Sequence, residues 1–289
     1  MRVAVTGAHG QLGRSLTRTA PPEIELHAWT REELDICNDG LVNESLHTLR
    51  PDVVINAAAY TAVDQAESDT QAAKAVNVDA VDFLAKHIRQ IGGRLIHIST
   101  DFVFSGDKST PYLPNDETAP INIYGKTKLE GEKRALLHLD DRVVVLRSAW
   151  LYSSFGSNFV TTILNAARSR KSLRVVSDQV GSPTWTVTLA RAIWRMVFLP
   201  EIHGTFHWAD EGQVSRYDFA LAIVEESART GLIDEKVEIQ PVQSIDYPMP
   251  AQRPPYSVLE TSDTVKAIEL PPQPWRSNLR LLMEEMAGA

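Results

Sequence analysis

The sequence contains a single cysteine, Cys37, among its 289 residues. An intrachain disulfide and a cysteine-rich metal site are therefore both excluded, as is typical of proteins from a reducing compartment. No apolar run reaches the roughly 18 residues that a membrane-spanning helix needs, and the apolar-rich stretch MRVAV at the N-terminus is too short for a signal peptide. From these absences we expect a cytoplasmic protein that is not held in a membrane.

Positive charge is also in deficit, because 29 Lys and Arg residues face 37 Asp and Glu residues and leave a net charge of -8. This balance argues against nucleic acid or an anionic membrane as the main partner, although it is compatible with a local basic pocket for an anionic ligand. Hydrophobic residues make up 43% of the chain and charged residues 23%, so a disordered chain is excluded. The length suits one or two domains with an ample core.

Short β-rich runs alternate with longer helical patterns in the first half of the chain. We expect strands at residues 3–6, 24–29, 53–56, 95–99 and 143–147, and helices at 11–19, 41–49, 71–91 and 124–137. This alternation predicts an α/β fold with a Rossmann-type, doubly wound parallel sheet. After about residue 150 the pattern loosens, with strands expected at 174–176, 205–208 and 237–239 and helices at 186–198 and 215–229. We therefore expect one domain over residues 1–150 and a smaller region over 151–289, interleaved with the last elements of the sheet.

Three glycines follow the first expected strand directly, in the segment T-G-A-H-G-Q-L-G. Gly7 permits a tight turn, Gly10 lets backbone N–H groups approach a pyrophosphate, and Gly13 lets the helix pack closely on the strand. Between a strand and a helix this pattern predicts a dinucleotide-binding loop, with a purely structural turn as the alternative. The spacing G-x-x-G-x-x-G resembles that of the extended short-chain dehydrogenases/reductases.

A second motif, Y-x-x-x-K, places Tyr124 and Lys128 at the start of an expected helix. The spacing of four puts the phenol and the ammonium on one helical face, where the ammonium is expected to lower the pKa of the tyrosine from its usual value near 10. Thr100 ends an expected strand whose carboxyl edge faces the same crevice, and its hydroxyl can hydrogen-bond a substrate carbonyl oxygen. Because Y-x-x-x-K alone is common on ordinary amphipathic helices, only the three residues together predict a catalytic set.

Longer segments resemble the dTDP-4-dehydrorhamnose reductases over nearly the whole chain. The similar segments are residues 56–67 (N-A-A-A-Y-T-A-V-D-Q-A-E), 99–104, 120–132, 147–152, 178–184 and 253–259. The resemblance implies NADPH-dependent reduction of dTDP-4-dehydro-L-rhamnose at C4 to dTDP-L-rhamnose, with Tyr124 as the proton donor. It further implies that residues 1–150 bind NAD(P) and that residues 151–289 bind the sugar nucleotide.

The resemblance also assigns roles to individual positions. The cofactor-binding set it implies is Gly7, Gly10, Gln11, Leu12 and Gly13 at the pyrophosphate, Asp35 and Ile36 at the adenine, Ala58, Ala59 and Tyr60 toward the nicotinamide, and Tyr124 with Lys128. On the substrate side, Thr100, Asp101 and Trp150 would contact the sugar nucleotide, and Arg253 would pair with its diphosphate. The alternatives are a core aromatic for Trp150 and a surface arginine for Arg253.

The segment after the second expected strand bears on the choice of cofactor. It reads Ala28-Trp29-Thr30-Arg31, with no acid before Glu32. An acid there would bind the ribose 2′-hydroxyl of NAD, whereas Thr30 and Arg31 suit a 2′-phosphate, so we expect NADPH with NADH also accepted. His203 and His207 lie in a β-rich context and are not assigned as metal ligands. Relatives occur as monomers and dimers, some with magnesium at the interface, and magnesium ligands stay unassigned in this chain.

Two alternative functions remain open at this point. One is the reduction of another 4-keto dTDP-deoxysugar, because the sequence does not show the details of the pocket. The other is a non-catalytic regulatory subunit similar to the methionine adenosyltransferase accessory protein, which shares this fold. The intact set of Thr100, Tyr124 and Lys128 argues against regulation alone.

Overall fold

The computed structural model describes residues 1–169, 172–233 and 237–288. Its strands are β1 (Arg2–Thr6), β2 (Glu25–Trp29), β3 (Val53–Asn56), β4 (Arg94–Thr100), β5 (Val143–Ser148), β6 (Leu151–Tyr152), β7 (Ser172–Val176), β8 (Val180–Gly181), β9 (Thr184–Trp185), β10 (Gly204–Trp208), β11 (Val214–Ser215) and β12 (Glu238–Val242). Its helices are α1 (Gln11–Arg18), α2 (Asp39–Leu49), α3 (Val63–Ala66), α4 (Thr70–Lys74), α5 (Ala80–Ile91), α6 (Ile123–Leu139), α7 (Phe159–Ser169), α8 (Thr186–Val197), α9 (Arg216–Arg229), α10 (Ser262–Ile268) and α11 (Trp275–Gly288), with a π-helical turn at Ala75–Asp79 and 3₁₀ turns at Asp101–Val103, Asp140–Arg142 and Ser244–Asp246. Within the described ranges, no helix is long and apolar enough to cross a membrane.

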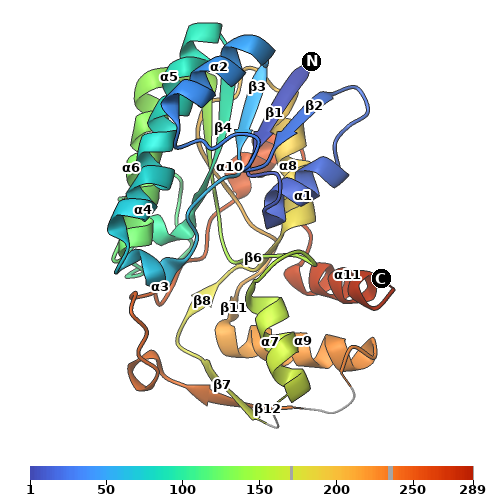
Figure 1. Cartoon of the computed structure of the whole chain (residues 1–289). Coiled ribbons are helices and arrows are strands. Elements are labelled where there is room, and N and C mark those ends of the chain that lie inside the picture. The colour runs from blue at the N-terminus through green and yellow to red at the C-terminus, as the bar shows by residue number, and fades with distance from the viewer. Residues whose placement is uncertain (170–171, 234–236, 289) are drawn as a thin grey trace.

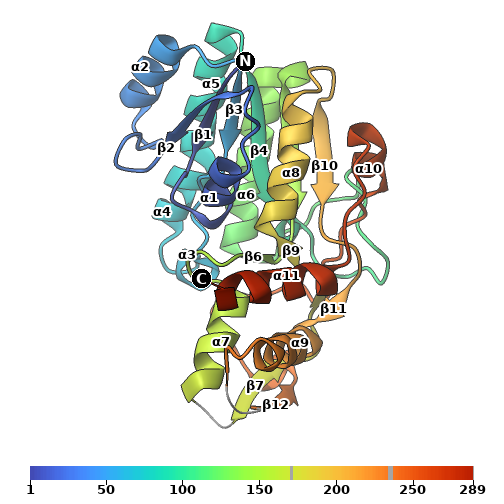
Figure 2. The ribbon, with the colours of Figure 1, turned by 90° about the vertical axis from the view of Figure 1, so that its right-hand side faces the viewer.

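Six strands form one parallel sheet in the order β2-β1-β3-β4-β5-β10 (Figure 1). Both faces of this sheet are buried, as the short strand β1 illustrates: Val3 and Val5 enter one core cluster and Ala4 enters another. Helices α2, α5 and α6 cover one face, and α1 and α8 cover the other (Figure 2). The prediction of a Rossmann-type, doubly wound parallel sheet is therefore confirmed.

The strand order reverses between β1 and β3, which both lie inside the sheet. In open α/β sheets ligands bind at such a reversal, outside the carboxyl ends of the strands. Gly7 follows β1 there, Ala58 lies two residues beyond β3, and Thr100 ends β4. The fold thus brings the glycine loop and the predicted catalytic threonine to one edge of the sheet.

A smaller lobe lies beyond this edge, in the lower half of Figure 1. It contains α7, α9 and α11 with the strand pairs β7–β12, β8–β11 and β6–β9, and its core includes Tyr152 and Phe219. The second half of the chain also returns to the large sheet, because β10 pairs with β5, and α8 packs on α1 with the hydroxyls of Ser15 and Thr186 2.7 Å apart. Residues 151–289 therefore contribute to both lobes.

The structure differs from the sequence prediction in three respects. Helices α3, α7, α10 and α11 lie outside the predicted set, as do the two-residue strands β6, β8, β9 and β11. The helix predicted over 71–91 is interrupted by the π-helical turn. Asn77 sits in that turn, accepts a hydrogen bond from the backbone N–H of Tyr60 (2.9 Å) and donates to Thr127 (3.1 Å). Such turns are frequent at functional sites. The turn could not be predicted from the sequence, because residues 75–79 are of the same types as the helix around them and the apolar pattern continues through them.

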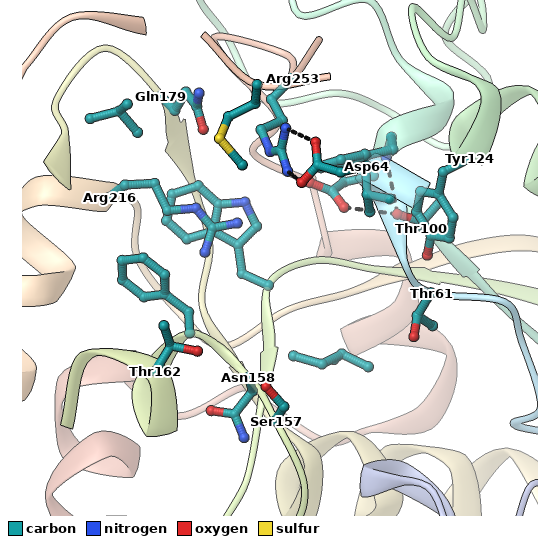
Figure 3. Close-up of a pocket in the computed structure, with 18 of the residues that line it drawn as sticks. Thr61, Asp64, Thr100, Tyr124, Ser157, Asn158, Thr162, Gln179, Arg216 and Arg253 are labelled. Carbon is teal, nitrogen blue, oxygen red and sulfur yellow. Dashed lines mark hydrogen bonds and ion pairs between the residues drawn. The ribbon is translucent and has the colours of Figure 1, made fainter. Parts of the chain in front are cut away.

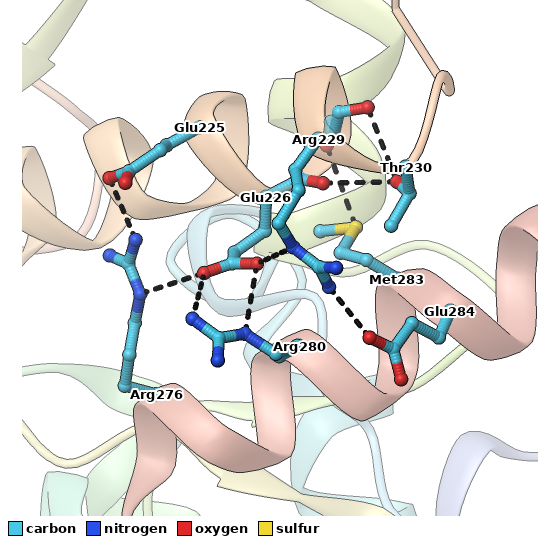
Figure 4. Close-up of polar contacts among 9 residues, drawn as sticks. Glu225, Glu226, Arg229, Thr230, Arg276, Arg280, Met283 and Glu284 are labelled. Carbon is cyan, nitrogen blue, oxygen red and sulfur yellow. Dashed lines mark hydrogen bonds and ion pairs between the residues drawn. The ribbon is translucent and has the colours of Figure 1, made fainter.

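The buried carboxylate of Glu226 in α9 forms ion pairs with arginines of helix α11 (Figure 4). Glu226, with only 2% of its side chain exposed, bonds to Arg229 (2.8 Å), Arg276 (3.2 Å) and Arg280 (3.3 Å). Burial raises the pKa of Glu226, but the bonds from Arg280 and Arg229 outweigh it and hold the pKa below its ordinary value. The carboxylate is thus charged at neutral pH and joins the two helices.

Candidate active site

A cavity of about 770 Å³ lies between the carboxyl ends of β4 and β5 and the smaller lobe (Figure 3). One wall comes from these strand ends and the start of α6, and the other from α7, β7 and the start of α9. Six of the residues predicted from the sequence line it, namely Gln11, Thr100, Asp101, Tyr124, Trp150 and Arg253. The cavity therefore unites the predicted proton donor with all predicted substrate contacts.

Tyr124 lies at the N-terminus of α6, close to Thr100 (Figure 3). Asn122 caps this helix by accepting a hydrogen bond from Gly125 N (2.7 Å). A side chain at Gly125 would place its Cβ 2.1 Å from the carbonyl oxygen of Phe102, so glycine is required for the helix to approach the loop after β4. Burial raises the pKa of Tyr124 to about 12. A hydrogen bond with the Thr100 hydroxyl lowers this pKa, but the effect of burial is larger.

Lys128 lies one turn further along α6 and is 2% exposed. Its ammonium donates to the carbonyl oxygen of Ile98 at 2.6 Å. Burial lowers the pKa of Lys128 to about 8, although the Glu132 carboxylate opposes this shift. The expectation that Lys128 lowers the pKa of Tyr124 is therefore wrong for this structure: loss of water around the phenol dominates, and the pKa of Tyr124 is raised.

A buried ion pair lies on the same helical face beneath Lys128. Glu132 accepts hydrogen bonds from Arg147 Nε (2.9 Å) and Nη2 (2.7 Å), and from the Ser99 hydroxyl. Ser99 and Arg147 belong to the adjacent strands β4 and β5, so Glu132 ties α6 to the sheet where Tyr124 and Lys128 are presented. The sequence analysis assigned no role to these residues.

Asp101 follows Thr100 directly and is 2% exposed. Its Oδ1 accepts a hydrogen bond from the Thr100 hydroxyl at 3.0 Å, and its Oδ2 has no hydrogen-bond partner among the described residues. Burial raises the pKa of Asp101 to about 6. The residue lines the cavity, and the Ser257 hydroxyl lies close enough to lower the pKa of this carboxyl. A buried carboxylate at a cavity is suited to accept a hydrogen bond from a ligand hydroxyl.

The residues around the glycine loop fit a dinucleotide. Gly7 has a φ of +71°, and a Cβ there would lie 2.7 Å from the backbone nitrogen of Ala58. A Cβ on Gly13 would lie 2.2 Å from the carbonyl oxygen of Gly7, so the helix packs closely on the loop. Gly10 caps α1 without a side-chain acceptor, which leaves the N–H groups of Gln11 and Leu12 available to an anion.

The other predicted cofactor positions lie around this loop, after β2 and β3. Arg31 is exposed, and Thr30 donates its backbone N–H to Glu33 at 2.8 Å. Asp35 accepts a hydrogen bond from Cys37 N (3.0 Å), while the side chain of Ile36 is buried in the core on the α2 side. After β3 come Ala58, Ala59 and Tyr60, and the buried hydroxyl of Tyr60 has no partner among the described residues.

Trp150 lines the cavity in a strained backbone conformation. Its φ is +47°, which is unusual for a bulky residue and typical of functional sites. A Cβ on Gly181 would lie 2.5 Å from the indole, so the ring depends on that glycine. The ring also packs against the core of the smaller lobe, so Trp150 has both a cavity surface and a core contact.

Three charged residues of the cavity lie outside the predicted set, namely Asp64, Arg174 and Arg216. The guanidinium carbon of Arg216 lies 3.5 Å from the centroid of the Trp150 ring. Asp64 receives two hydrogen bonds from Arg253, at 2.9 and 2.6 Å. No motif in the sequence marks Arg216, which simply begins α9. The binding of a diphosphate by Arg253 stays a prediction, and its guanidinium is engaged with a carboxylate.

His203 directly precedes strand β10 and His207 lies within it, in agreement with the β-rich context in the sequence. His207 is buried and its Nδ1 lies 3.0 Å from the carbonyl oxygen of Tyr112. Across the described part of the chain, no group of three or more His, Cys, Asp or Glu side chains is arranged to hold a metal ion.

Comparison with known proteins places this geometry in a family. The family model "RmlD substrate binding domain" matches residues 1–287. A dTDP-4-dehydrorhamnose reductase of Aggregatibacter actinomycetemcomitans is 38% identical over 286 residues, which are 96% of this chain and 97% of that protein.

Two solved structures agree with this match. A dTDP-4-dehydrorhamnose reductase of Bacillus anthracis in complex with NADP has a TM-score of 0.92 and 33% identity, and the similarity covers 98% of this chain and 99% of the other. A dTDP-4-dehydrorhamnose reductase of Clostridium acetobutylicum has a TM-score of 0.92 and 36% identity, with 99% of each chain covered. Because sequence and structure match over almost the full length, the chain belongs to the family of the dTDP-4-dehydrorhamnose reductases.

Proposed function

We propose that this protein reduces dTDP-4-dehydro-L-rhamnose at C4 to dTDP-L-rhamnose, with NADPH as the reductant. The observation that carries this proposal is the position of Tyr124 and Thr100 in the wall of a large cavity, at the same sheet edge as the glycine loop. Relatives that carry the name dTDP-4-dehydrorhamnose reductase support the substrate, and the similar structure in complex with NADP supports the cofactor.

When bound, NADPH supplies a hydride to C4 of the keto-sugar. Tyr124 donates its phenolic proton to the C4 oxygen as negative charge develops there. A pKa of about 12 keeps this phenol protonated at neutral pH, as an acid requires. An alkoxide is a stronger base than a phenolate, so the transfer is downhill. Thr100 holds the same oxygen by a hydrogen bond once its hydroxyl, which donates to Asp101 Oδ1 without the ligand, turns its single proton to the substrate.

Lys128 supports the cofactor and the proton donor Tyr124. Its ammonium has three N–H donors, one of which is directed to the Ile98 carbonyl, and the others would reach the nicotinamide ribose and the phenol side of Tyr124. Asp101 accepts a sugar hydroxyl at its unpartnered Oδ2, and Trp150 covers the sugar.

We assign the remaining cofactor contacts to the segments after β1, β2 and β3. These contacts are Gly7, Gly10, Gln11, Leu12 and Gly13 at the pyrophosphate, Thr30 and Arg31 at the 2′-phosphate, Asp35 and Ile36 at the adenine, and Ala58, Ala59 and Tyr60 toward the nicotinamide. With no acid after β2 before Glu32, NADPH is preferred and NADH is accepted more weakly. We infer that residues 1–150 supply the NADPH site, that residues 151–289 bind the sugar nucleotide together with Thr100, Asp101 and Trp150, and that the enzyme acts in the cytoplasm.

The test is direct. The protein is incubated with NADPH and purified dTDP-4-dehydro-L-rhamnose, and the absorbance of the reduced cofactor is followed while the product is identified by chromatography. We expect one NADPH consumed for each dTDP-L-rhamnose formed. Turnover only with a different 4-keto dTDP-sugar would refute the substrate, and no turnover with any such sugar would refute the enzymatic activity. The Tyr124→Phe variant serves as the control for contaminating reductases.

A further inference from the structure

Arg216 lies in the cavity wall that faces Tyr124 and Thr100 (Figure 3). It is the first residue of α9, and its guanidinium carbon lies 3.5 Å from the centroid of the Trp150 ring and 4.9 Å from that of Phe159. Stacking of this kind covers the face of a guanidinium and leaves the N–H donors at its edge. The two aromatic rings thus fix the position of the Arg216 guanidinium and leave its N–H groups able to donate hydrogen bonds to another group.

Within the described ranges, the guanidinium of Arg216 makes no hydrogen bond and no ion pair; only its backbone N–H is bonded, to Gln179 O at 3.0 Å. Burial lowers the pKa of Arg216 to about 9, and Asp101 opposes that shift. A partly buried charge without a direct partner is costly, so such groups normally meet a counter-charge when a ligand binds. The unpaired guanidinium therefore indicates an anionic ligand group.

Arg253 presents the opposite case. Both of its terminal nitrogens bond to the carboxylate of Asp64, at 2.9 and 2.6 Å, and one also donates to the carbonyl oxygen of Ala251 at 2.7 Å. Its fork is therefore already satisfied by protein groups, and it ties the 251–253 segment to α3. The third arginine of the cavity wall, Arg174, lies over the Tyr247 ring with its guanidinium carbon 5.8 Å from the centroid, and it donates to the carbonyl oxygen of Asp246 at 3.4 Å. Of the three, Arg216 is the one whose guanidinium has no hydrogen bond to the described residues.

The chemistry of the proposed substrate places an anion near Arg216. In a pyranose ring C1 and C4 are at opposite corners, and the diphosphate of a nucleotide sugar is attached at C1. When C4 faces Tyr124, the diphosphate points toward the opposite wall, where Arg216 lies (Figure 3). A guanidinium edge matches the oxygens of a phosphate in a two-pronged contact.

We propose that Arg216, held on the Trp150 ring, binds the diphosphate of the sugar nucleotide and so fixes the substrate end remote from C4. This assignment rests on the proposed function, because the position of C4 at Tyr124 sets the direction of the diphosphate. Trp150 then has a second role as the platform of Arg216, and Arg253 holds the local loop.

The experiment measures binding of dTDP and of thymidine, which lacks the phosphates, to the NADP⁺-loaded enzyme by calorimetry. Arg216→Met retains an apolar stem over Trp150 and removes the charge, whereas Arg216→Lys keeps the charge and removes the fork. We expect Arg216→Met to weaken dTDP about 10- to 100-fold, Arg216→Lys to weaken it less, and thymidine affinity to change little. Arg253→Met is the matched comparison, and its main effect should be a lower melting temperature.

The outcomes separate this assignment from the proposed function. If dTDP affinity stays within about threefold of wild type in both Arg216 variants, or if thymidine and dTDP lose affinity equally, Arg216 does not bind the diphosphate. Wild-type turnover of dTDP-4-dehydro-L-rhamnose would still stand in that case. If dTDP binding depends on Arg216 while the wild-type enzyme fails to oxidise NADPH with that sugar, the assignment holds and the proposed reaction fails. Should Arg216→Met not fold, Arg216→Lys alone decides the comparison.

Discussion

Replacing Tyr124 by phenylalanine removes a single oxygen atom from the proposed proton donor. The ring itself is retained, and with it the edge-to-face contact with Phe102, whose centroid lies 5.8 Å away. The interaction with Thr100 is lost, which costs about 0.5–1.5 kcal/mol of unfolding free energy and lowers the melting temperature by only a few degrees in a domain of this size. We therefore expect Tyr124→Phe to fold and to bind NADPH and dTDP as the wild type does.

The rate should respond far more strongly than the stability. Since burial keeps the pKa of Tyr124 at about 12, the wild-type phenol is fully protonated at neutral pH and its proton is available in every turnover. A positioned general acid contributes about 10² to 10⁴-fold, so kcat of the variant should fall within that range while KM stays nearly constant. The assay is NADPH oxidation with saturating substrate, repeated with NADPH that carries deuterium at the transferred position.

The deuterium comparison decides how the result is interpreted. Slow product release can mask a defect in chemistry, and only a clear isotope effect shows that hydride transfer limits the rate. If Tyr124→Phe retains more than about a tenth of wild-type kcat under that condition, the proton comes from another group, contrary to the expected contribution of a general acid. The Thr100 hydroxyl and a water held by Asp101 would be the next candidates, because Thr100 and Asp101 line the same cavity as Tyr124.

Three further predictions concern the charges of the molecule. Burial lowers the pKa of Lys128 to about 8, so kcat/KM for NADPH should decline as the pH rises through that value and the ammonium loses its proton; a flat profile well above it would show that the charge is not used. Arg31→Ala should raise KM for NADPH about 10-fold or more and leave KM for NADH nearly unchanged, and an equal effect on both would exclude contact with the 2′-phosphate. Glu226→Ala should reduce the unfolding free energy by about 1–3 kcal/mol in denaturant titrations. This loss is modest for a buried carboxylate, because its three arginine partners are partly exposed and are hydrated again in the variant. Because the pKa of Glu226 is lowered from 4.5 on folding, its stabilisation is present above that pH and is lost as the pH falls below it, so the difference between wild type and Glu226→Gln should shrink in acid. An unchanged difference there would refute the ionic role.

The parts of the fold that sequence reasoning predicts are those with local signatures. Strands β1, β3, β4 and β5 are buried on both faces and appear in the sequence as mainly apolar runs, which His97 interrupts in β4, so their number and order along the chain were predictable. The glycine loop was predictable because a φ of +71° at Gly7 and the close contact at Gly13 both require glycine. At positions 7 and 13 glycine is the only residue that the backbone tolerates.

Other features depend on contacts between distant segments and leave no local signature. Helix α11 is mixed in polarity, and what fixes it is the meeting of its arginines with Glu226, about 50 residues earlier in the chain. Arg216 is one of many arginines in the sequence and becomes distinctive only because Trp150 lies beneath it. Trp150 in turn needs the glycine at 181, which stands in the segment 178–184 that resembles the family but whose contact with the indole no local pattern shows.

The pKa of Tyr124 shows where motif reasoning stops and burial takes over. A spacing of four does put Lys128 on the helical face of Tyr124, but the ammonium is directed to the carbonyl of Ile98, and both groups are removed from water. Burial penalises the charged form of each group, so it raises the pKa of the phenol to about 12 and lowers that of the ammonium to about 8. The same burial therefore produces a neutral acid and a cation that gives up its proton more easily than usual. For a reductase this is the useful direction, because the phenol must carry its proton until the C4 oxygen becomes basic enough to take it.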